Sequence, residues 1–268
     1  MIAALVFSRD RACQLDLLLE SIERNGRKIF QRIYVLYRAT NEDHEEGYRI
    51  CAEEHPLVQF VPDGITSFQL TATLLSAADH GCFFTDDSVL YRLLPSEIPH
   101  DALHDEVLCF SLRLGRNTTW CYPHGKTQRL PRFSRDKAAL VWDWTKADGD
   151  FGYPASVDGH IFRGGTLRPA LHDCPPDASP NQVEDHLVQT IGHFYNGQRL
   201  MSCFEESCLV GLPLNVVTQT HRNRNGERYP WSSDSLLGHY LEGQRIDLDG
   251  LDFSDIRGAH QELKLVFR

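Results

Sequence analysis

The sequence of 268 residues lacks any apolar run long enough to span a membrane. Its first residues, MIAALVF, form a short apolar run that ends before Arg9, and no basic residue precedes that run. A secretory signal has a basic start and a longer apolar core, so this pattern predicts neither a signal peptide nor a membrane anchor. We therefore expect a cytoplasmic protein with no membrane span.

Positive charge is also scarce. Lys and Arg number 27 against 37 Asp and Glu, which gives a formal net charge of −10. This balance argues against a surface that holds nucleic acid or anionic lipid, because both are polyanions. A local basic patch at 221–224 (HRNR) is an exception.

Several motifs of common enzyme classes are missing. The absence of GxGxxG after the first apolar run disfavours a nicotinamide or flavin enzyme, and the absence of GxxxxGK followed by Ser or Thr disfavours a P-loop enzyme. No GxSxG supports an α/β-hydrolase. The eight cysteines are scattered without a CxxC pair. They predict buried thiols in a reducing compartment rather than a structural zinc site.

Apolar residues in the first third of the chain alternate between strand-like runs and helical spacing. Apolar runs of strand length lie at 2–7, 30–37, 57–61 and 82–84. Segments with helical spacing lie between them, at 15–22, 41–54 and 68–78. This β-α-β-α-β-α-β order predicts an α/β fold whose mostly parallel, Rossmann-like sheet is flanked by helices.

Polar clusters follow three of the predicted strands. Ser8-Arg9-Asp10 follows the first, Asp63 the third and the pair Asp86-Asp87 the fourth. Ligands of open α/β sheets bind beyond the carboxyl ends of the strands, so we expect these clusters to converge on one site. Plainer interpretations stay open: an N-cap at Ser8 or Asp10, an Asp-Gly turn at Asp63, and a turn or the N-cap of a helix at Asp86-Asp87.

The second half of the chain is less regular. After a predicted strand at 107–114, residues 116–180 are rich in Pro, Gly and Trp, which is typical of functional loops or irregular β structure. Further on, the pattern predicts helices at 182–194 and 232–241 and strands at 214–218 and 262–267. No repeat or low-complexity linker divides the chain. We expect a single domain over 1–268 with two halves that meet near residue 115.

Three stretches resemble the family 2-like glycosyltransferases of the GT-A fold, which use nucleotide-sugars: LVFSRDRACQLDLLLESI at 5–22, GCFFTDDSVLYR at 81–92 and GYPASVDGHIFR at 152–163. The resemblance implies a GT-A type α/β fold. Residues 1–115 would then be the nucleotide-sugar-binding half, and 116–268 an irregular, acceptor-binding half.

The family's acidic signature, Asp-any-Asp, corresponds to Thr85-Asp86-Asp87, in which Thr85 replaces the first aspartate. The resemblance implies that Asp87 binds Mn²⁺ or Mg²⁺, with Asp86 as a direct or indirect partner. Such hard cations take oxygen ligands and neutralise the charge of a diphosphate leaving group.

The same resemblance implies that Ser8, Arg9 and Asp10 contact the nucleotide. Arg9 or Arg11 would pair with the diphosphate, since arginine suits phosphate oxygens. Asp63 would hold the base or the ribose.

A base for the acceptor hydroxyl is predicted in the second half. Asp158 matches the family position most closely, although Val157 precedes it where relatives carry Glu; Glu184 is the second candidate. An N-cap at Ser156 or Asp158 and an acidic first helical turn around Glu184 are the alternatives. His186 is a further candidate for binding a metal or phosphate. The resemblance also implies that His260 could reach a metal, but an ordinary exposed histidine is the favoured interpretation.

Four aromatic residues, Trp142, Trp144, Phe151 and Tyr153, lie near the second-half motif. They fit either a sugar site or the core under an irregular loop.

These patterns and the resemblance together imply a metal-dependent glycosyltransferase that moves a sugar from a nucleoside-diphosphate donor to a hydroxyl on a saccharide or other small acceptor. In our interpretation the nucleotide is uridine-based and the anomeric configuration of the sugar is inverted. Three alternatives stay open: a nucleotidyltransferase, which the glycine-free loop SRDRACQ disfavours, a transferase acting on a hydroxylated nucleic-acid base, and an inactive nucleotide-sugar-binding module.

Overall fold

A computed structural model describes residues 1–268 except 65, 137–138, 195–196 and 217–223. Its strands are β1 Ile2–Arg9, β2 Phe30–Arg38, β3 Gln59–Pro62, β4 His80–Thr85, β5 Ser88–Leu90, β6 Val107–Ser111, β7 Trp120–Cys121, β8 Lys126–Thr127, β9 Ser134–Asp136, β10 Ala139–Asp143, β11 His160–Arg163, β12 Leu200–Cys203 and β13 Leu209–Gly211. Its α-helices are α1 Ala12–Asn25, α2 Glu42–Glu54, α3 Ser67–Ala77, α4 Gly164–His172, α5 Pro180–Phe194 and α6 Ser233–Leu241.

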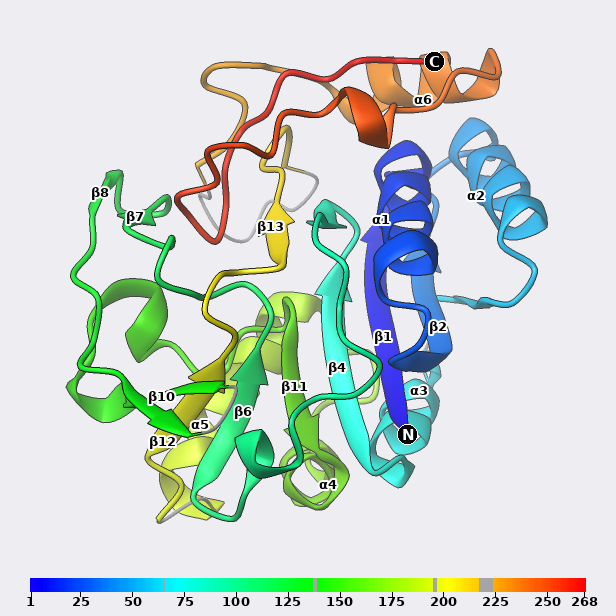
Figure 1. The fold of residues 1–268 in the computed structure, drawn as a ribbon. Coiled ribbons are helices and arrows are strands. Elements are labelled where there is room, and N and C mark those ends of the chain that lie inside the picture. The colour runs from blue at the N-terminus through cyan, green and yellow to red at the C-terminus, as the bar shows by residue number, and fades with distance from the viewer. Residues whose placement is uncertain (65, 137–138, 195–196, 217–223) are drawn as a thin grey trace.

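The central sheet has nine strands in the order β3-β2-β1-β4-β11-β6-β12-β10-β9 (Figure 1). The first four strands of the chain pair in parallel, as β3-β2-β1-β4. On the other side of β4, strand β11 runs antiparallel to both of its neighbours, β4 and β6. The predicted α/β class is confirmed, with a parallel first part and a mixed second part.

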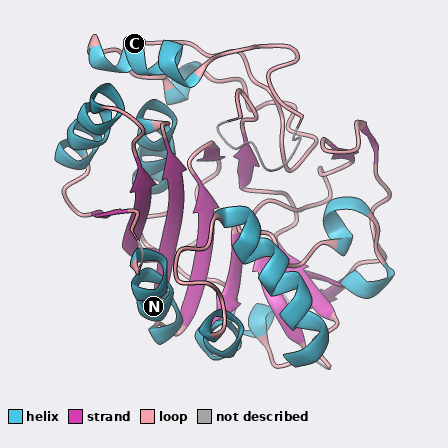
Figure 2. Cartoon of the chain, turned by 180° about the vertical axis from the view of Figure 1, so that it is seen from behind, coloured by secondary structure: helices cyan, strands magenta, loops and turns pink. Residues whose placement is uncertain are grey.

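Helices cover both faces of this sheet (Figures 1 and 2). Alternate residues of a strand point to opposite faces. In β1, Ala4 and Val6 pack with residues of α1, α2 and α6, whereas Leu5 and Phe7 pack with residues of α3, α4 and α5. Each face of the sheet therefore has its own apolar core. Because β1 is covered on both faces, both sets of its alternating side chains are buried, which explains its continuous apolar run.

The elements predicted for the first third are confirmed within a few residues of their predicted ends. The helices predicted at 182–194 and 232–241 correspond to α5 and α6. Helix α5 begins where Ser179 and Gln182 form a reciprocal cap, in which each side chain accepts from the other's backbone N–H at 3.4 and 2.9 Å.

Several second-half predictions are wrong. Residues 262–267 contain no strand, and only an isolated bridge joins Phe267 to Ile246. Of the strand predicted at 214–218, residues 214–216 are irregular and 217–218 lie outside the described residues. Helix α4 was not predicted, because its sequence GGTLRPALH begins with two glycines and contains Pro169.

Gly159 fixes the chain at the point where β11 enters the sheet. Its φ is +72°, which favours glycine, and an added Cβ would lie 2.2 Å from the side chain of Leu209. Its N–H donates to the carbonyl of Phe83 at 2.7 Å, and its carbonyl accepts from Leu112 at 2.9 Å. The preceding residue, Asp158, is thereby held at the edge of the sheet between β4 and β6.

All eight cysteines are free and buried, as predicted. Among the described helices none is both long and apolar enough to cross a membrane.

Candidate active site

A cavity of about 720 Å³ lies beyond the carboxyl ends of β1 and β4. The predicted residues that line it are Ser8, Arg9, Arg11, Asp63, Thr85, Asp86, Asp87, Asp158, Glu184 and His260. Asp10 and His186 are not among its lining residues. The structure thus brings the polar clusters after the first, third and fourth strands together with the second-half candidates.

No side chain of the loop between β1 and α1 caps the start of α1. The N-cap residue of α1 is Arg11, and its side chain makes no capping hydrogen bond. Asp10 has a φ of +54°, and its carboxylate accepts from the N–H of Thr40 at 2.8 Å. The N-cap interpretation of Ser8 and Asp10 is therefore wrong. Asp10 instead ties this loop to the chain beyond β2.

Asp86 anchors the same loop from the end of β4. Its Oδ2 accepts from the hydroxyl of Ser8 at 2.9 Å and from the N–H of Arg9 at 3.1 Å. Its Oδ1 accepts from Nη1 of Arg11 at 2.9 Å. Burial raises the pKa of Asp86 to about 6, against the opposing charge of Arg11. Both oxygens of this buried carboxylate already have protein donors.

Asp87 is placed differently. Its side chain is 19% exposed, against 4% for Asp86. Its Oδ2 accepts from Nη1 of Arg11 at 3.1 Å, and no hydrogen bond to its Oδ1 is found among the described residues. The chain continues into strand β5 rather than into a helix, so the helix N-cap interpretation of this pair is wrong and the turn interpretation is confirmed.

The donor set around Asp87 fits a hard divalent cation. Mg²⁺ and Mn²⁺ prefer oxygen, and Mg²⁺ is usually bound by one or two carboxylates together with substrate phosphates. Among the described residues, another group brings metal-ligand atoms together: Asp16, Cys51 and His55, within 4.8 Å of one another. None of these three lines the cavity, and His55 is already paired with Asp16 at 3.0 Å.

Arg11 is the centre of this side of the site. Besides the two aspartates, its Nε donates to Oδ1 of Asn215 at 2.7 Å and its Nη2 to the carbonyl of Asn215 at 2.5 Å. To pair with a diphosphate, as predicted, Arg11 would have to give up some of these hydrogen bonds. Arg9 has a side chain that is 46% exposed and lies 3.7 Å from Asp10, so it is the freer cation. Sequence analysis missed Asn215, which follows no strand and belongs to no motif.

Asp158 belongs to a buried group beside the acidic turn, next to Ser88. Its Oδ1 accepts from the hydroxyl of Ser88 at 2.5 Å. Its Oδ2 lies 3.3 Å from Nη1 of Arg113 and 3.9 Å from Nε2 of His260. This oxygen is shielded from solvent and accepts no hydrogen bond from any residue that the structure describes. A strand, not a helix, follows Asp158, so its N-cap interpretation is wrong, and that of Ser156 with it.

Arg113 is the cation that organises this group, and sequence analysis missed it. Its Nη1 donates to the hydroxyl of Ser156 at 2.7 Å and its Nη2 to Nδ1 of His260 at 3.1 Å. In the sequence Arg113 lies inside the strand predicted at 107–114, whereas in the structure β6 ends at Ser111 and Arg113 follows it. Burial lowers the pKa of His260 to about 4, and the charge of Arg113 acts in the same direction. His260 is therefore a neutral, cavity-lining residue, and its interpretation as an ordinary exposed histidine is wrong.

The tautomer of His260 follows from its partner. A guanidinium only donates hydrogen bonds, so Nδ1 of His260 accepts and the ring proton lies on Nε2. In this arrangement neither ring nitrogen offers a free lone pair to a metal.

Glu184 lies on α5, beside the loop that leads to Asp158. Its Oε1 accepts from the N–H of Val157 at 2.9 Å and its Oε2 from the hydroxyl of Tyr153 at 3.4 Å. Burial raises the pKa of Glu184, against the hydrogen bond from Val157 and the charge of Arg113. The alternative interpretation, an acidic first turn of a helix, is confirmed for the cap at Ser179 and wrong for Glu184, because no acidic residue lies in the first turn of α5.

The four second-half aromatics divide between the two interpretations. Trp142 and Phe151 pack edge to face in the core, with ring centroids 5.4 Å apart, and Trp144 packs against the same core. Tyr153 lines the cavity and is 39% exposed.

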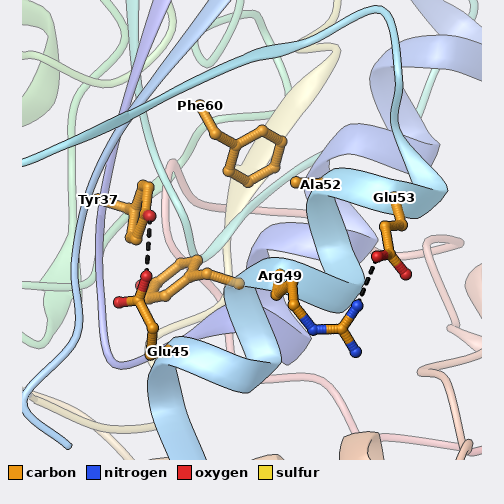
Figure 3. A pocket seen from close by; sticks show the side chains of 7 residues that line it. Tyr37, Glu45, Arg49, Ala52, Glu53 and Phe60 are labelled. Atoms are coloured by element: carbon orange, nitrogen blue, oxygen red, sulfur yellow. Dashed lines mark hydrogen bonds and ion pairs between the residues drawn. The ribbon is translucent and has the colours of Figure 1, made fainter. Parts of the chain in front are cut away.

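A second, smaller pocket of about 340 Å³ lies between α2 and the ends of β2 and β3 (Figure 3). The hydroxyl of Tyr37 donates there to Glu45 at 3.1 Å, and Arg49 pairs with Glu53. Tyr48 lines this pocket and also contacts the loop between β1 and α1 (residues 8–11, named the donor loop below), because its hydroxyl is 2.7 Å from the hydroxyl of Ser8.

No family model matches the chain. Among solved structures, TarS from S. aureus has a TM-score of 0.47 and 13% identity, covering 78% of this chain and 36% of that one. A cytidylyltransferase from Leptospira borgpetersenii has a TM-score of 0.42 and 11% identity, covering 90% of this chain and 94% of that one.

Sequence comparison finds the bifunctional glycosyltransferase pgtA of Dictyostelium discoideum. It is 25% identical over 182 residues, which cover 60% of this chain and 24% of that protein. The chain thus spans about a quarter of the length of the curated relative that it matches. The resemblance to glycosyltransferases that the sequence motifs predict is confirmed by this similarity.

Proposed function

We propose that the chain is a glycosyltransferase that moves a sugar from a nucleoside-diphosphate donor to a hydroxyl acceptor. The observation that carries the proposal is that one cavity is lined both by the acidic turn with its donor loop and by the carboxylates of the second half. The similarity to pgtA supports the same chemistry.

On the donor side, Asp87 is our proposed ligand for Mn²⁺ or Mg²⁺. A bound divalent cation would neutralise charge on the diphosphate as it leaves. Arg9 would pair with the same diphosphate, and the exposure of its guanidinium supports this role. Asp86 would hold the loop that carries Ser8 and Arg9, rather than contact the cation itself.

For the nucleotide we retain uridine as the proposal, with Asp63 at the base. Asp63 lines the cavity, and its N–H donates to the carbonyl of Tyr37 at 2.7 Å, which fixes it beside the end of β2. A carboxylate there can accept from the imide N–H of uracil.

Inversion requires one base that takes the proton of the acceptor hydroxyl while the acceptor oxygen attacks the anomeric carbon and the diphosphate leaves. Glu184 suits this role better than Asp158. Its raised pKa makes its carboxylate a stronger base than an ordinary glutamate, and its hydrogen-bond partners are the N–H of Val157 and the hydroxyls of Tyr153 and Ser156. Asp158 instead directs one oxygen to Ser88 and keeps the other, shielded one beside Arg113.

The activity is tested by incubating the protein with a panel of UDP-, GDP-, CDP- and ADP-sugars and Mn²⁺ and measuring released nucleotide, with and without a mixture of saccharide acceptors. We expect release from a UDP-sugar, and a thermal shift that is larger with UDP plus Mn²⁺ than with either alone. No release from any donor and no thermal shift would contradict the proposal. A thermal shift without release under any condition would favour the inactive binding module.

The base is tested by comparing Glu184→Gln with Asp158→Asn. We expect Glu184→Gln to lower kcat by about 10²–10⁴-fold with unchanged donor affinity, the range for loss of a general base. In the wild type, the acid limb of kcat/KM should lie above the ordinary pKa of glutamate, because burial raises the pKa of Glu184. Glu184→Gln with full activity, together with an inactive but folded Asp158→Asn, would return the role to Asp158.

A further inference from the structure

Tyr153 presents an aromatic ring to the cavity directly beside Glu184. Resting on the function proposed above, we propose that this ring is the platform for the acceptor, and that the acceptor is a neutral saccharide whose C–H face packs on it. The ring is 39% exposed and lines the cavity, unlike the neighbouring Trp142 and Phe151, which are buried in the core. Aromatic rings bury large apolar areas at a small entropic cost, and the C–H-rich face of a pyranose is such an area.

The backbone that carries Tyr153 is fixed before any ligand binds. Gly149 begins a 3₁₀ turn with a φ of +59°, and an added Cβ there would lie 2.5 Å from Oε1 of Gln128. The side chain of Gln128 bonds both the backbone and the side chain of Asp150. Its Oε1 accepts from the N–H of Asp150 and its Nε2 donates to Oδ2 of Asp150, each at 3.0 Å. A ring on so rigid a turn loses little conformational freedom on binding.

The hydroxyl of Tyr153 links the platform to the proposed base. It donates to Oε2 of Glu184 at 3.4 Å. The charged groups that also face Glu184 are Arg113 and Asp158. A sugar that packs on the ring therefore lies next to the carboxylate that takes its hydroxyl proton, which orients acceptor and base together.

The charges around the ring favour a neutral acceptor. Asp150, Asp177 and Glu184 line the same cavity as the ring. Two of the cavity's described arginines already have carboxylate partners: Arg113 lies 3.3 Å from Asp158, and Arg224 lies 2.6 Å from Glu227. Arg9 and Arg38, which also line the cavity, stand at the ends of β1 and β2, where we propose that the donor binds. A phosphorylated sugar or a nucleic acid on the ring would thus meet these carboxylates beside arginines that are already paired.

The platform is tested by steady-state kinetics of Tyr153→Ala and Tyr153→Leu with methyl pyranosides of glucose, galactose, mannose and N-acetylglucosamine as acceptors. We expect the acceptor KM to rise about tenfold or more in both variants relative to Tyr153→Phe, which keeps the ring and lacks the same hydroxyl. The wild type should prefer the neutral glycosides over glucose 6-phosphate and over a dinucleotide. An unchanged acceptor KM, or a preference for the anionic acceptors, would overturn this inference while leaving the proposed function in place.

Removal of the hydroxyl alone gives a second test that does not depend on the ring. Tyr153→Phe should keep the acceptor KM and shift the acid limb of the pH–rate profile, because Glu184 loses a donor. Tyr37→Phe is the matched control: it removes a tyrosine–glutamate hydrogen bond of 3.1 Å outside the cavity (Figure 3) and should leave the profile unchanged. Equal profiles for wild type and Tyr153→Phe would overturn the link to Glu184. A wild type that neither hydrolyses nor transfers any donor sugar would overturn the proposed function and this inference with it.

Discussion

At the scale of residues, two buried arginines organise the walls of the cavity. Arg11 joins the donor loop to the acidic turn and to Asn215, and Arg113 joins the end of β6 to Ser156 and His260. Each side chain is less than a tenth exposed, at 9% and 7%. A buried guanidinium needs several acceptors to offset its lost hydration, so each arginine fixes the segments around it.

Replacement of Asp86 is expected to affect mainly the stability of the fold, and replacement of Asp87 mainly the affinity for nucleotide. Asp86→Ala removes the acceptor of Ser8, Arg9 and Arg11 and should lower the free energy of unfolding by about 3 kcal/mol or more, because it leaves buried donors unpaired. Asp87→Ala should cost about 1 kcal/mol or less but lower the affinity for UDP in Mn²⁺ at least tenfold. Urea denaturation and isothermal titration calorimetry measure the two effects. Equal loss of stability in both variants would argue against separate roles.

Sequence reasoning found the residues that follow predicted strands and could not find their partners. Asp63, Asp86 and Asp87 were identifiable because a carboxylate after an apolar run has few structural reasons to be there. Arg113 and Asn215 carry no such signal. Their roles depend on side chains far away in the sequence, such as Asn215 on Arg11 across 204 residues, and only the tertiary structure brings these together.

At the scale of elements, a buried ionic group joins α1, α2 and the segment after α6. His55 lies 3.0 Å from Asp16 and 3.2 Å from Glu23. The hydroxyl of Tyr240 donates to Asp16 at 3.3 Å, and Arg245 pairs with Glu54 at 2.5 Å. Burial alone would lower the pKa of His55, but the bonds and charges of Asp16 and Glu23 outweigh it and raise that pKa.

This group should make stability depend on pH in a definite direction. Because the pKa of His55 is higher in the folded chain than its ordinary 6.5, its stabilising contribution is fully present below that value and is lost as the pH rises through the folded-state pKa. His55→Gln should therefore cost more unfolding free energy at pH 5.5 than at pH 8.5, with about 2 kcal/mol lost at the lower pH. His172→Gln, which changes an exposed histidine beside Asp173, is the control. An equal cost of His55→Gln at both pH values would show that the histidine is not protonated in the fold.

The parallel elements were predictable and the antiparallel insertion was not. Strands at 2–9, 30–38 and 80–85 and the helices between them follow from apolar periodicity, which reports burial on one or both faces. Strand β11 is four residues long, and no periodicity tells which neighbours a short apolar run will pair with. The N-cap interpretation of Asp158 failed because Gly159, with its positive φ, turns the chain directly into this strand.

At the scale of the whole molecule, the sheet interleaves the two halves of the chain. Strand β11, from the second half, pairs with β4 from the first, and the same two apolar cores collect residues from both. The predicted boundary near residue 115, with donor binding before it and acceptor binding after it, stays a prediction.

Interleaving of this kind predicts one cooperative unfolding transition. We expect far-ultraviolet circular dichroism, which reports the helices of both halves, and tryptophan fluorescence, which reports residues 120–231, to change at the same urea concentration. Two separate midpoints would show that the halves unfold independently. The comparison needs no ligand.

The place of β11 also matters while the chain is being made. When residues 1–115 have left the ribosome, β4 has its partner β1 on one side only, and its other edge stays open until residues 160–163 emerge. An open edge of a buried apolar strand is a template for other chains. Truncated versions that stop ahead of Arg163 should accordingly collect in inclusion bodies. A soluble fragment that contains β4 will have to include β11 as well.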